Sequence, residues 1–132
     1  MSISLTPQNG HTAEVLLVTR VSDARPGKQD VRSLTDQQHM LEKWLRANLT
    51  VRLKVTVNSC KGRGEEIDRK ELFDLIDLVD SERFDLLLVE DLGRILRRAR
   101  AIEFVENCVD RKTRMITVND HIDSRIEDAV LV

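Results

Sequence analysis

The octapeptide Val15-Leu16-Leu17-Val18-Thr19-Arg20-Val21-Ser22 decides the fold expected for this chain. Its first half is an unbroken aliphatic run, which is typical of a strand buried on both faces in a parallel sheet covered by helices. Ligands of open α/β sheets gather at the carboxyl ends of such strands. Arg20 and Ser22 follow the run at that end, so they are the first candidates for a site: a hydroxyl nucleophile beside an anion-binding guanidinium. The Arg-x-Ser triplet alone is weak evidence for catalysis.

The composition indicates one domain with an adequate core and a highly charged surface. The chain has 132 residues, of which 41% are hydrophobic and 33% charged. Its net charge of −2 excludes a generally basic protein, so any nucleic-acid contact must depend on the local placement of its 21 basic residues. Cys60 and Cys108 cannot form a disulfide framework. No segment resembles a signal peptide or a membrane span, and we expect a cytoplasmic protein without membrane contact.

The apolar pattern alternates between strands and helices along the whole chain. We expect strands near 14–20, 51–57, 84–89 and 115–118, and helices near 34–48, 69–79 and 93–109. This order predicts a three-layer α/β/α fold with a mainly parallel central sheet of about four strands. The second strand alternates apolar with polar residues and belongs at an edge, whereas the third is nearly all apolar and belongs in the centre. Residues 1–12 are predicted to form a flexible N-terminal arm, and 58–68 a polar loop.

Four arginines crowd the expected start of the third helix: Arg94, Arg97, Arg98 and Arg100. Basic residues there oppose the helix dipole, and such conflicts with local preference occur where function overrides stability. Guanidinium groups beside free helix N–H groups form a good phosphate site. The alternative, left open by these residues alone, is that nearby acids pair with the arginines on a solvated face: Glu90, Asp91 and Glu103.

Parallel topology should bring the loops after the first three strands to one edge. Arg69 opens the second helix just beyond such a loop, so one crevice is expected to hold five residues: Arg20, Ser22, Arg69, Arg94 and Arg97. A hydroxyl ringed by arginines, without a histidine base, indicates chemistry on a phosphodiester. The three histidines show no ligand spacing, so we expect no metal site.

Five segments, in order, resemble the catalytic domain of the serine site-specific recombinases, the resolvase and invertase family. Arg20-Val21-Ser22 is similar to the R-V-S that bears the nucleophile, and Ser33-Leu34-Thr35-Asp36-Gln37 to the S-L-x-x-Q that opens the first helix. The loop from Ser59 to Asp68-Arg69 ends in the family's D-R. Leu92-Gly93-Arg94-Ile95-Leu96-Arg97 is similar to L-D-R-x-x-R, and residues 116–123 to the segment before the family's long helix. The long loop after Ser22 is more like the large serine recombinases.

The resemblance implies a catalytic domain over residues 13–124, with residues 125–132 as the start of a truncated C-terminal helix. It implies that Ser22 attacks a DNA phosphate to form a 5′-phosphoserine intermediate, without metal or other cofactor. Arg20, Arg69, Arg94 and Arg97 would hold the phosphate, and Gln37 and Asp68 would support the site. Contacts with the DNA backbone are expected from several basic residues: Lys28, Arg32, Lys61, Arg63 and Arg98. The implied partners are a specific recombination site on DNA and, in the full-length form, further copies in a dimer or synaptic tetramer.

Two departures leave a second interpretation open. Gly93 stands where the family usually has an aspartate, and the chain stops at Val132, near the start of the long helix. The alternative is therefore a truncated or catalytically decayed relative that folds but does not recombine DNA. An unrelated nucleotide- or protein-binding α/β domain is a third possibility, but the chain has no glycine-rich phosphate loop.

Overall fold

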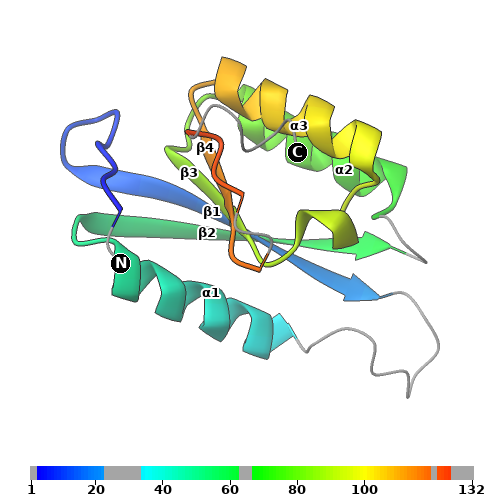
Figure 1. Cartoon of the computed structure of the whole chain (residues 1–132), viewed down its shortest axis with the longest axis horizontal. Coiled ribbons are helices and arrows are strands. Elements are labelled where there is room, and N and C mark those ends of the chain that lie inside the picture. Colours follow the sequence, from blue (N-terminus) through cyan, green and yellow to red (C-terminus); the bar gives the residue numbers. More distant parts are fainter. Residues whose placement is uncertain (1–2, 23–33, 63–66, 120–121, 126–132) are drawn as a thin grey trace.

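The computed structural model describes residues 3–22, 34–62, 67–119 and 122–125, and Val21, Ser22, Arg94 and Arg98 by their backbone alone. Within these described ranges, four strands and three α-helices alternate (Figure 1). Their bounds are β1 (Thr12–Ser22), α1 (Leu34–Asn48), β2 (Arg52–Gly62), α2 (Arg69–Asp80), β3 (Leu86–Val89), α3 (Arg98–Asp110) and β4 (Arg114–Thr117), with a 3₁₀ turn η1 (Leu92–Arg94) before α3.

The four strands form one parallel sheet in the order β2-β1-β3-β4. Helix α1 covers one face, and α2 and α3 cover the other (Figure 1). The predicted three-layer α/β/α fold is therefore confirmed. The prediction that β2 lies at an edge and β3 in the interior of the sheet is confirmed as well.

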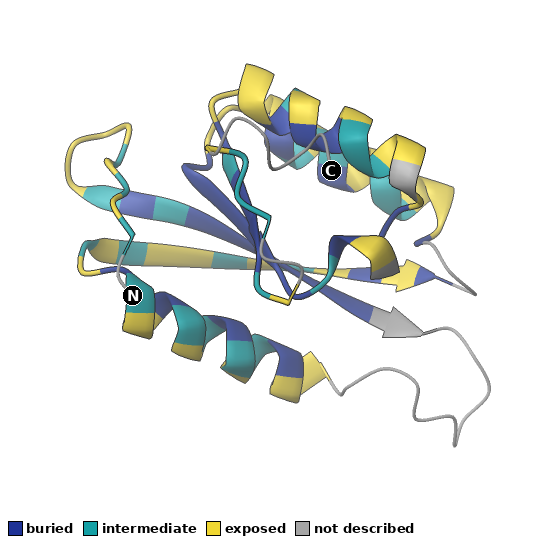
Figure 2. Ribbon diagram, viewed as in Figure 1, coloured by how far each residue is buried: buried dark blue, intermediate teal, exposed yellow. Residues whose placement is uncertain are grey.

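The aliphatic run of β1 explains these three layers. Val15 and Leu17 pack in the cluster that includes residues of α1, whereas Leu16 and Val18 pack in the cluster under α2 and α3. All four side chains are at most 2% exposed, because helices cover both faces of the strand. In Figure 2 the buried residues follow the middle of the sheet, and the exposed ones follow the outer faces of the helices.

Strand β2 is longer than the sequence predicted. It pairs with β1 without interruption from Thr12↔Arg52 to Ser22↔Gly62, so residues 58–62 of the predicted polar loop belong to the strand. Polar composition misled the prediction because an edge strand exposes side chains that a central strand must bury. Lys61 is exposed at this end, whereas Cys60 is buried.

The third helix begins at Arg98, five residues later than predicted. Leu92, Ile95 and Leu96 are at most 4% exposed, and the carbonyl of Leu92 accepts hydrogen bonds from the N–H groups of Ile95 and Leu96. Because these residues pack into the core as a short 3₁₀ turn, the chain does not continue as one helix from residue 93. Arg97, the N-cap residue of α3, is extended, with φ −70° and ψ 157°. Arg94 and Arg97 therefore lie before the helix and not within it, which corrects the prediction of a helix from residue 93.

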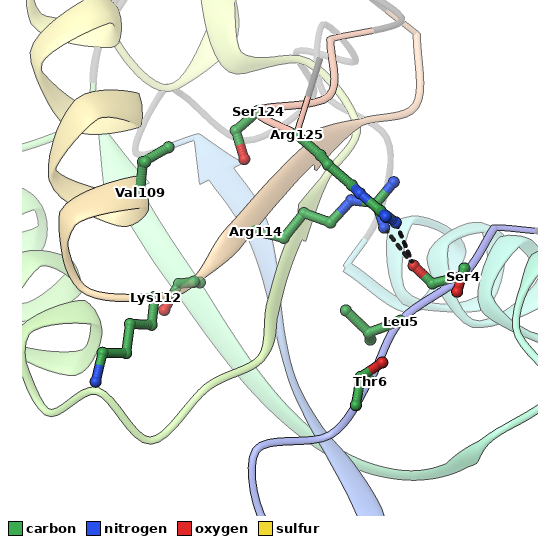
Figure 3. A pocket seen from close by; sticks show the side chains of 9 residues that line it. Ser4, Leu5, Thr6, Val109, Lys112, Arg114, Ser124 and Arg125 are labelled. Atoms are coloured by element: carbon green, nitrogen blue, oxygen red, sulfur yellow. Dashed lines mark hydrogen bonds between the residues drawn. The ribbon is translucent and has the colours of Figure 1, made fainter. Parts of the chain in front are cut away.

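The N-terminal segment lies at the opposite end of the sheet from the strands' carboxyl ends. The carboxylate of Asp85, 4% exposed, accepts the N–H groups of Gln8 and Glu14. Arg114 and Arg125 both donate to the carbonyl of Ser4, beside a cavity of about 380 Å³ (Figure 3). These hydrogen bonds hold Ser4 and Gln8 against the amino-terminal ends of β3 and β4. The predicted flexibility of residues 1–12 stays a prediction.

Arg114 also ties the last described segment to β4. Its guanidinium forms a two-pronged hydrogen bond with the carboxylate of Asp123, next to the antiparallel bridge between Ile116 and Asp123. Burial raises the pKa of Asp123, but the hydrogen bonds from Arg114 and from the Arg125 N–H, with both positive charges, outweigh it and hold that pKa below its ordinary value of 3.8. The predicted helix over 125–132 lies almost wholly outside the described residues. In the part of the chain that the structure describes, no helix is both long and apolar enough to cross a membrane.

Candidate functional site

The carboxyl ends of β1 and β2 and the starts of α2 and α3 meet at one edge of the sheet. Ser22 at the end of β1 pairs with Gly62 of β2. The N–H of Asp68 donates to the carbonyl of Lys61 at 2.8 Å, and the N–H of Ile67 donates to the carbonyl of Ile95 at 3.1 Å. These main-chain bonds connect the segments that carry Arg69, Arg94 and Arg97 to the segment that carries Ser22 (Figure 1, right-hand end).

Arg20 is buried, whereas Arg69 and Arg97, the other candidate arginines whose side chains the structure describes, are exposed. Arg20 is 8% exposed, and Gln37 of α1, 6% exposed, makes two hydrogen bonds to its main chain. The Arg20 N–H donates to Gln37 Oε1 at 2.9 Å, and Gln37 Nε2 donates to the Arg20 carbonyl at 2.7 Å. Strand β3 ends at Val89, opposite Val18 of β1. Beyond Val18, the side-chain amide of Gln37 takes the place of a neighbouring strand and bonds to the main chain of β1 at Arg20. Gln37 thereby holds the strand two residues before Ser22.

Arg69 lies at the first position of α2 and is exposed. Its guanidinium carbon lies 5.6 Å from the centre of the Phe73 ring, one helical turn further on. Asp68 precedes it as the exposed N-cap residue, without a side-chain capping bond, in a position where a carboxylate suits the positive end of the helix dipole. The D-R pair therefore sits at a helix start beside the end of β2.

Arg94 belongs to the turn η1, and Arg97 is the exposed N-cap residue of α3. The first turn of α3 contains no acidic residue, so the dipole and the basic residues there all favour an anion. Arg98 begins the helix itself, and Arg100 turns toward a groove between α2 and α3. This arrangement is suited to hold a phosphate group.

Two carboxylates stand between the end of β3 and this basic segment. Glu90 is 9% exposed and Asp91 is half-buried. The side-chain amide of Asn119 donates to Glu90 Oε1 and to Asp91 Oδ2, each at 3.2 Å. Asn119 was not among the site residues predicted from sequence, although it follows the fourth strand at the same edge and lies in the segment 116–123 that resembles the family.

Gly93, which occupies the place of the family's aspartate, is exposed in η1. A Cβ atom built on it would meet no atom of the described structure within 4 Å, and its φ lies outside the left-handed region. The backbone here therefore does not require glycine.

The remaining predicted residues divide by position. Lys61 is exposed at the converging edge, whereas Lys28, Arg32 and Arg63 lie outside the described residues. Burial, with smaller effects from the charges of Glu71 and Asp74, raises the pKa of the Cys60 thiol to about 12, so it is a poor nucleophile at neutral pH. Among the described residues, no group of three or more His, Cys, Asp or Glu side chains could hold a metal ion.

Several known proteins are similar to this chain in sequence or in fold. A family model described as the resolvase N-terminal domain matches residues 15–131. The N-terminal catalytic domain of TP901-1 integrase has a TM-score of 0.72 and 24% identity, covering 89% of this chain and 87% of that one. A resolvase family site-specific recombinase from Streptococcus pneumoniae has a TM-score of 0.66 and 21% identity, covering 87% and 78%. The C-terminal catalytic domain of ISC1926 TnpA, an IS607-like serine recombinase, has a TM-score of 0.59 and 19% identity, covering 79% and 68%. No curated protein sequence matches the chain.

Proposed function

The chain belongs to the resolvase N-terminal domain family, the catalytic domain of serine site-specific recombinases, and we propose that it cleaves and rejoins DNA through Ser22. The observation that carries the proposal is the hydrogen-bonded convergence of the β1 end with the segments bearing Arg69, Arg94 and Arg97. The resolvase match covers all of these segments.

The proposed reaction is a reversible phosphoryl transfer. The Ser22 hydroxyl loses its proton and its oxygen attacks a backbone phosphorus. The bond from phosphorus to the 3′ oxygen breaks, and that oxygen takes up a proton and leaves as a 3′-hydroxyl. The DNA remains joined to the protein as a 5′-phosphoserine, and a 3′-hydroxyl later reverses the attack. Because the phosphodiester's bond energy is kept in the covalent intermediate, rejoining requires no nucleotide cofactor.

The arginines have distinct places in this mechanism. Arg20 is buried in the strand that leads to Ser22, so its charge lowers the cost of developing an anion near the strand end. Arg69 at the start of α2, Arg94 in η1 and Arg97 at the N-cap of α3 lie at the same edge and neutralise the phosphate oxygens. Gln37 supports them indirectly, since it fixes the backbone of Arg20.

DNA is the substrate expected for the family, and synapsis brings several copies together. We propose a specific recombination site, with this domain acting in a dimer that joins a second dimer as a tetramer. Lys61 at the converging edge, with Lys28, Arg32, Arg63 and Arg98, would contact phosphates and so position the domain without reading sequence. A cytoplasmic location remains part of the proposal.

Covalent capture tests the nucleophile. The chain, alone and with downstream sequence where its gene continues, is incubated with a random-sequence library of nicked duplexes. We expect a denaturation-resistant protein–DNA adduct at the 5′ end. Ser22→Ala should abolish it, whereas Ser59→Ala, at an exposed serine near the same strand ends, should retain it. An adduct that persists in Ser22→Ala would refute the proposal.

A catalytically decayed relative is the alternative, motivated by Gly93 in the place of the family's aspartate, but the family match does not favour it. It predicts a folded chain that forms no adduct in either length. Restoration of the adduct by Gly93→Asp would then identify the lost aspartate as the cause.

A further inference from the structure

Phe73 lies in α2 in a position that core packing does not explain. Its side chain is 52% exposed, whereas Leu75 and Val79 of the same helix are at most 1% exposed. Phe73 lies four residues after Arg69, so the two side chains meet on one side of the helix.

The ring contacts the guanidinium of Arg69. The distance of 5.6 Å from the guanidinium carbon to the ring centre is within the range of a cation–π contact. Among the described residues, no carboxylate forms an ion pair with Arg69. The contact thus differs from those of Arg111 and Arg114, which are paired with acidic side chains.

The kind of contact determines what Arg69 can still bind. The five N–H donors of a guanidinium lie in its plane, and a carboxylate partner would occupy two of them and cancel the charge. An aromatic ring interacts with the cation without accepting those hydrogen bonds. Arg69 thereby keeps its charge and its hydrogen-bond donors while the Phe73 ring restricts the motion of its side chain.

The surroundings of the pair limit the directions open to Arg69. Both residues line a groove of about 420 Å³ between α2 and α3, together with Leu72, Ile76, Arg100, Glu103, Phe104 and Asn107. The positive charge of Arg100 on the facing helix disfavours entry of Arg69 into the groove. Glu103 is the one acidic residue among these lining residues, and the structure shows Arg69 in contact with the ring and in no ion pair with Glu103.

We propose that Phe73 is a positioning residue that restrains the Arg69 guanidinium at the start of α2, with its charge and its donors available to a phosphate at the carboxyl edge of the sheet. This inference rests on the proposed function, because it assigns Arg69 to the phosphate. The ring fixes a long side chain before DNA binds, so less conformational freedom is lost when the phosphate engages its donors.

The first test is spectroscopic and does not depend on activity. The Nε–H resonance of Arg69 in the ¹⁵N-labelled chain should be displaced by the ring current of Phe73. In Phe73→Leu that displacement should disappear and the order parameter of the Nε–H bond should fall. An unchanged resonance and order parameter in Phe73→Leu would overturn the inference.

The second test measures adduct formation on a duplex enriched by covalent capture. Phe73→Leu should slow the reaction about two- to five-fold, the factor that an exposed cation–π contact is worth, and should lower the melting temperature by no more than a few degrees. Phe73→Trp should restore the rate, and Val109→Ala, which trims a side chain that is 51% exposed, should leave it unchanged. A Phe73→Leu rate equal to wild type overturns the inference, as does a loss that Phe73→Trp does not repair.

Arg69→Ala separates this inference from the function beneath it. Loss of the adduct in Arg69→Ala with a normal rate in Phe73→Leu would overturn only the role of Phe73. A normal rate in Arg69→Ala would remove Arg69 from the site, and with it the proposed purpose of the contact.

Discussion

Replacement of Gln37 by alanine should destabilise the protein far more than a substitution of glutamine on a helix ordinarily does. Gln37 is 6% exposed, and its amide accepts the N–H and donates to the carbonyl of Arg20. In Gln37→Ala both main-chain groups lose their partner in a buried place. A buried unsatisfied polar group costs about 1–3 kcal/mol, so we expect a loss of about 2–4 kcal/mol in the free energy of unfolding.

Gln38 provides the matched control because it is the next residue of the same helix. Its side chain is half-buried and donates to Glu42 at 2.9 Å, one turn further on. Such a pair on a helix surface contributes about 0.2–0.5 kcal/mol, and the gain in helix propensity from alanine is the same at both positions. Gln37→Met adds a second comparison, since it keeps the side-chain volume and removes the hydrogen bonds.

Urea unfolding followed by circular dichroism measures all three variants. Gln37→Met should lose nearly as much stability as Gln37→Ala, and Gln38→Ala less than about 0.5 kcal/mol. Adduct formation should fall by about 100-fold in Gln37→Ala, because displacement of the strand end by an ångström can cost that much in rate. If Gln37→Ala matches Gln38→Ala in stability, then the amide does not support the end of β1 as described.

Three further outcomes are expected. Gly93→Asp should leave the melting temperature unchanged, because a Cβ there meets nothing within 4 Å, and should raise the rate of adduct formation; an unchanged rate would show that the aspartate is dispensable here. Asp123→Asn should lower the free energy of unfolding by about 1–2 kcal/mol at neutral pH. Because the pKa of Asp123 is lowered, its stabilising effect belongs to the ionised carboxylate, and the difference in stability between wild type and Asp123→Asn should shrink as the pH falls below 3.8. A stability difference that does not change with pH would contradict this. Cys60 and Cys108, both with a pKa of about 12, should resist thiol reagents at pH 8 until denaturant unfolds the chain, and fast labelling of the native protein would contradict their burial.

The sequence was sufficient where burial follows from local pattern. Four consecutive aliphatic residues at 15–18 require cover on both faces, and an inner strand of a helix-covered sheet provides it. Alternation from Val51 to Val57 predicted an edge strand, and the apolar residues of 34–48 predicted a helix that the structure contains at α1. Because successive elements alternate, parallel topology and a common edge for Ser22 and the helix starts followed from the same pattern.

The sequence failed where packing competes with local preference. The residues after Gly93 have a helical spacing, but burial of Leu92, Ile95 and Leu96 against the sheet forms a 3₁₀ turn and delays α3 to Arg98. The polar residues at 58–62 suggested a loop, whereas their pairing with β1 makes them strand. In both cases a contact distant in sequence outweighs the preference of neighbouring residues.

The amino-acid sequence by itself determined the order of the elements, the covered sheet and the residue types assembled at its edge, because hydrophobic periodicity is a local property. Only the tertiary structure decided the partners of individual polar atoms. Gln37 bonds to a main chain 17 residues away, and the Asn119 amide reaches carboxylates 28 and 29 residues earlier. Such partners depend on how separate elements pack, since hydrogen bonds require atoms placed within a few tenths of an ångström, and no local pattern contains that distance.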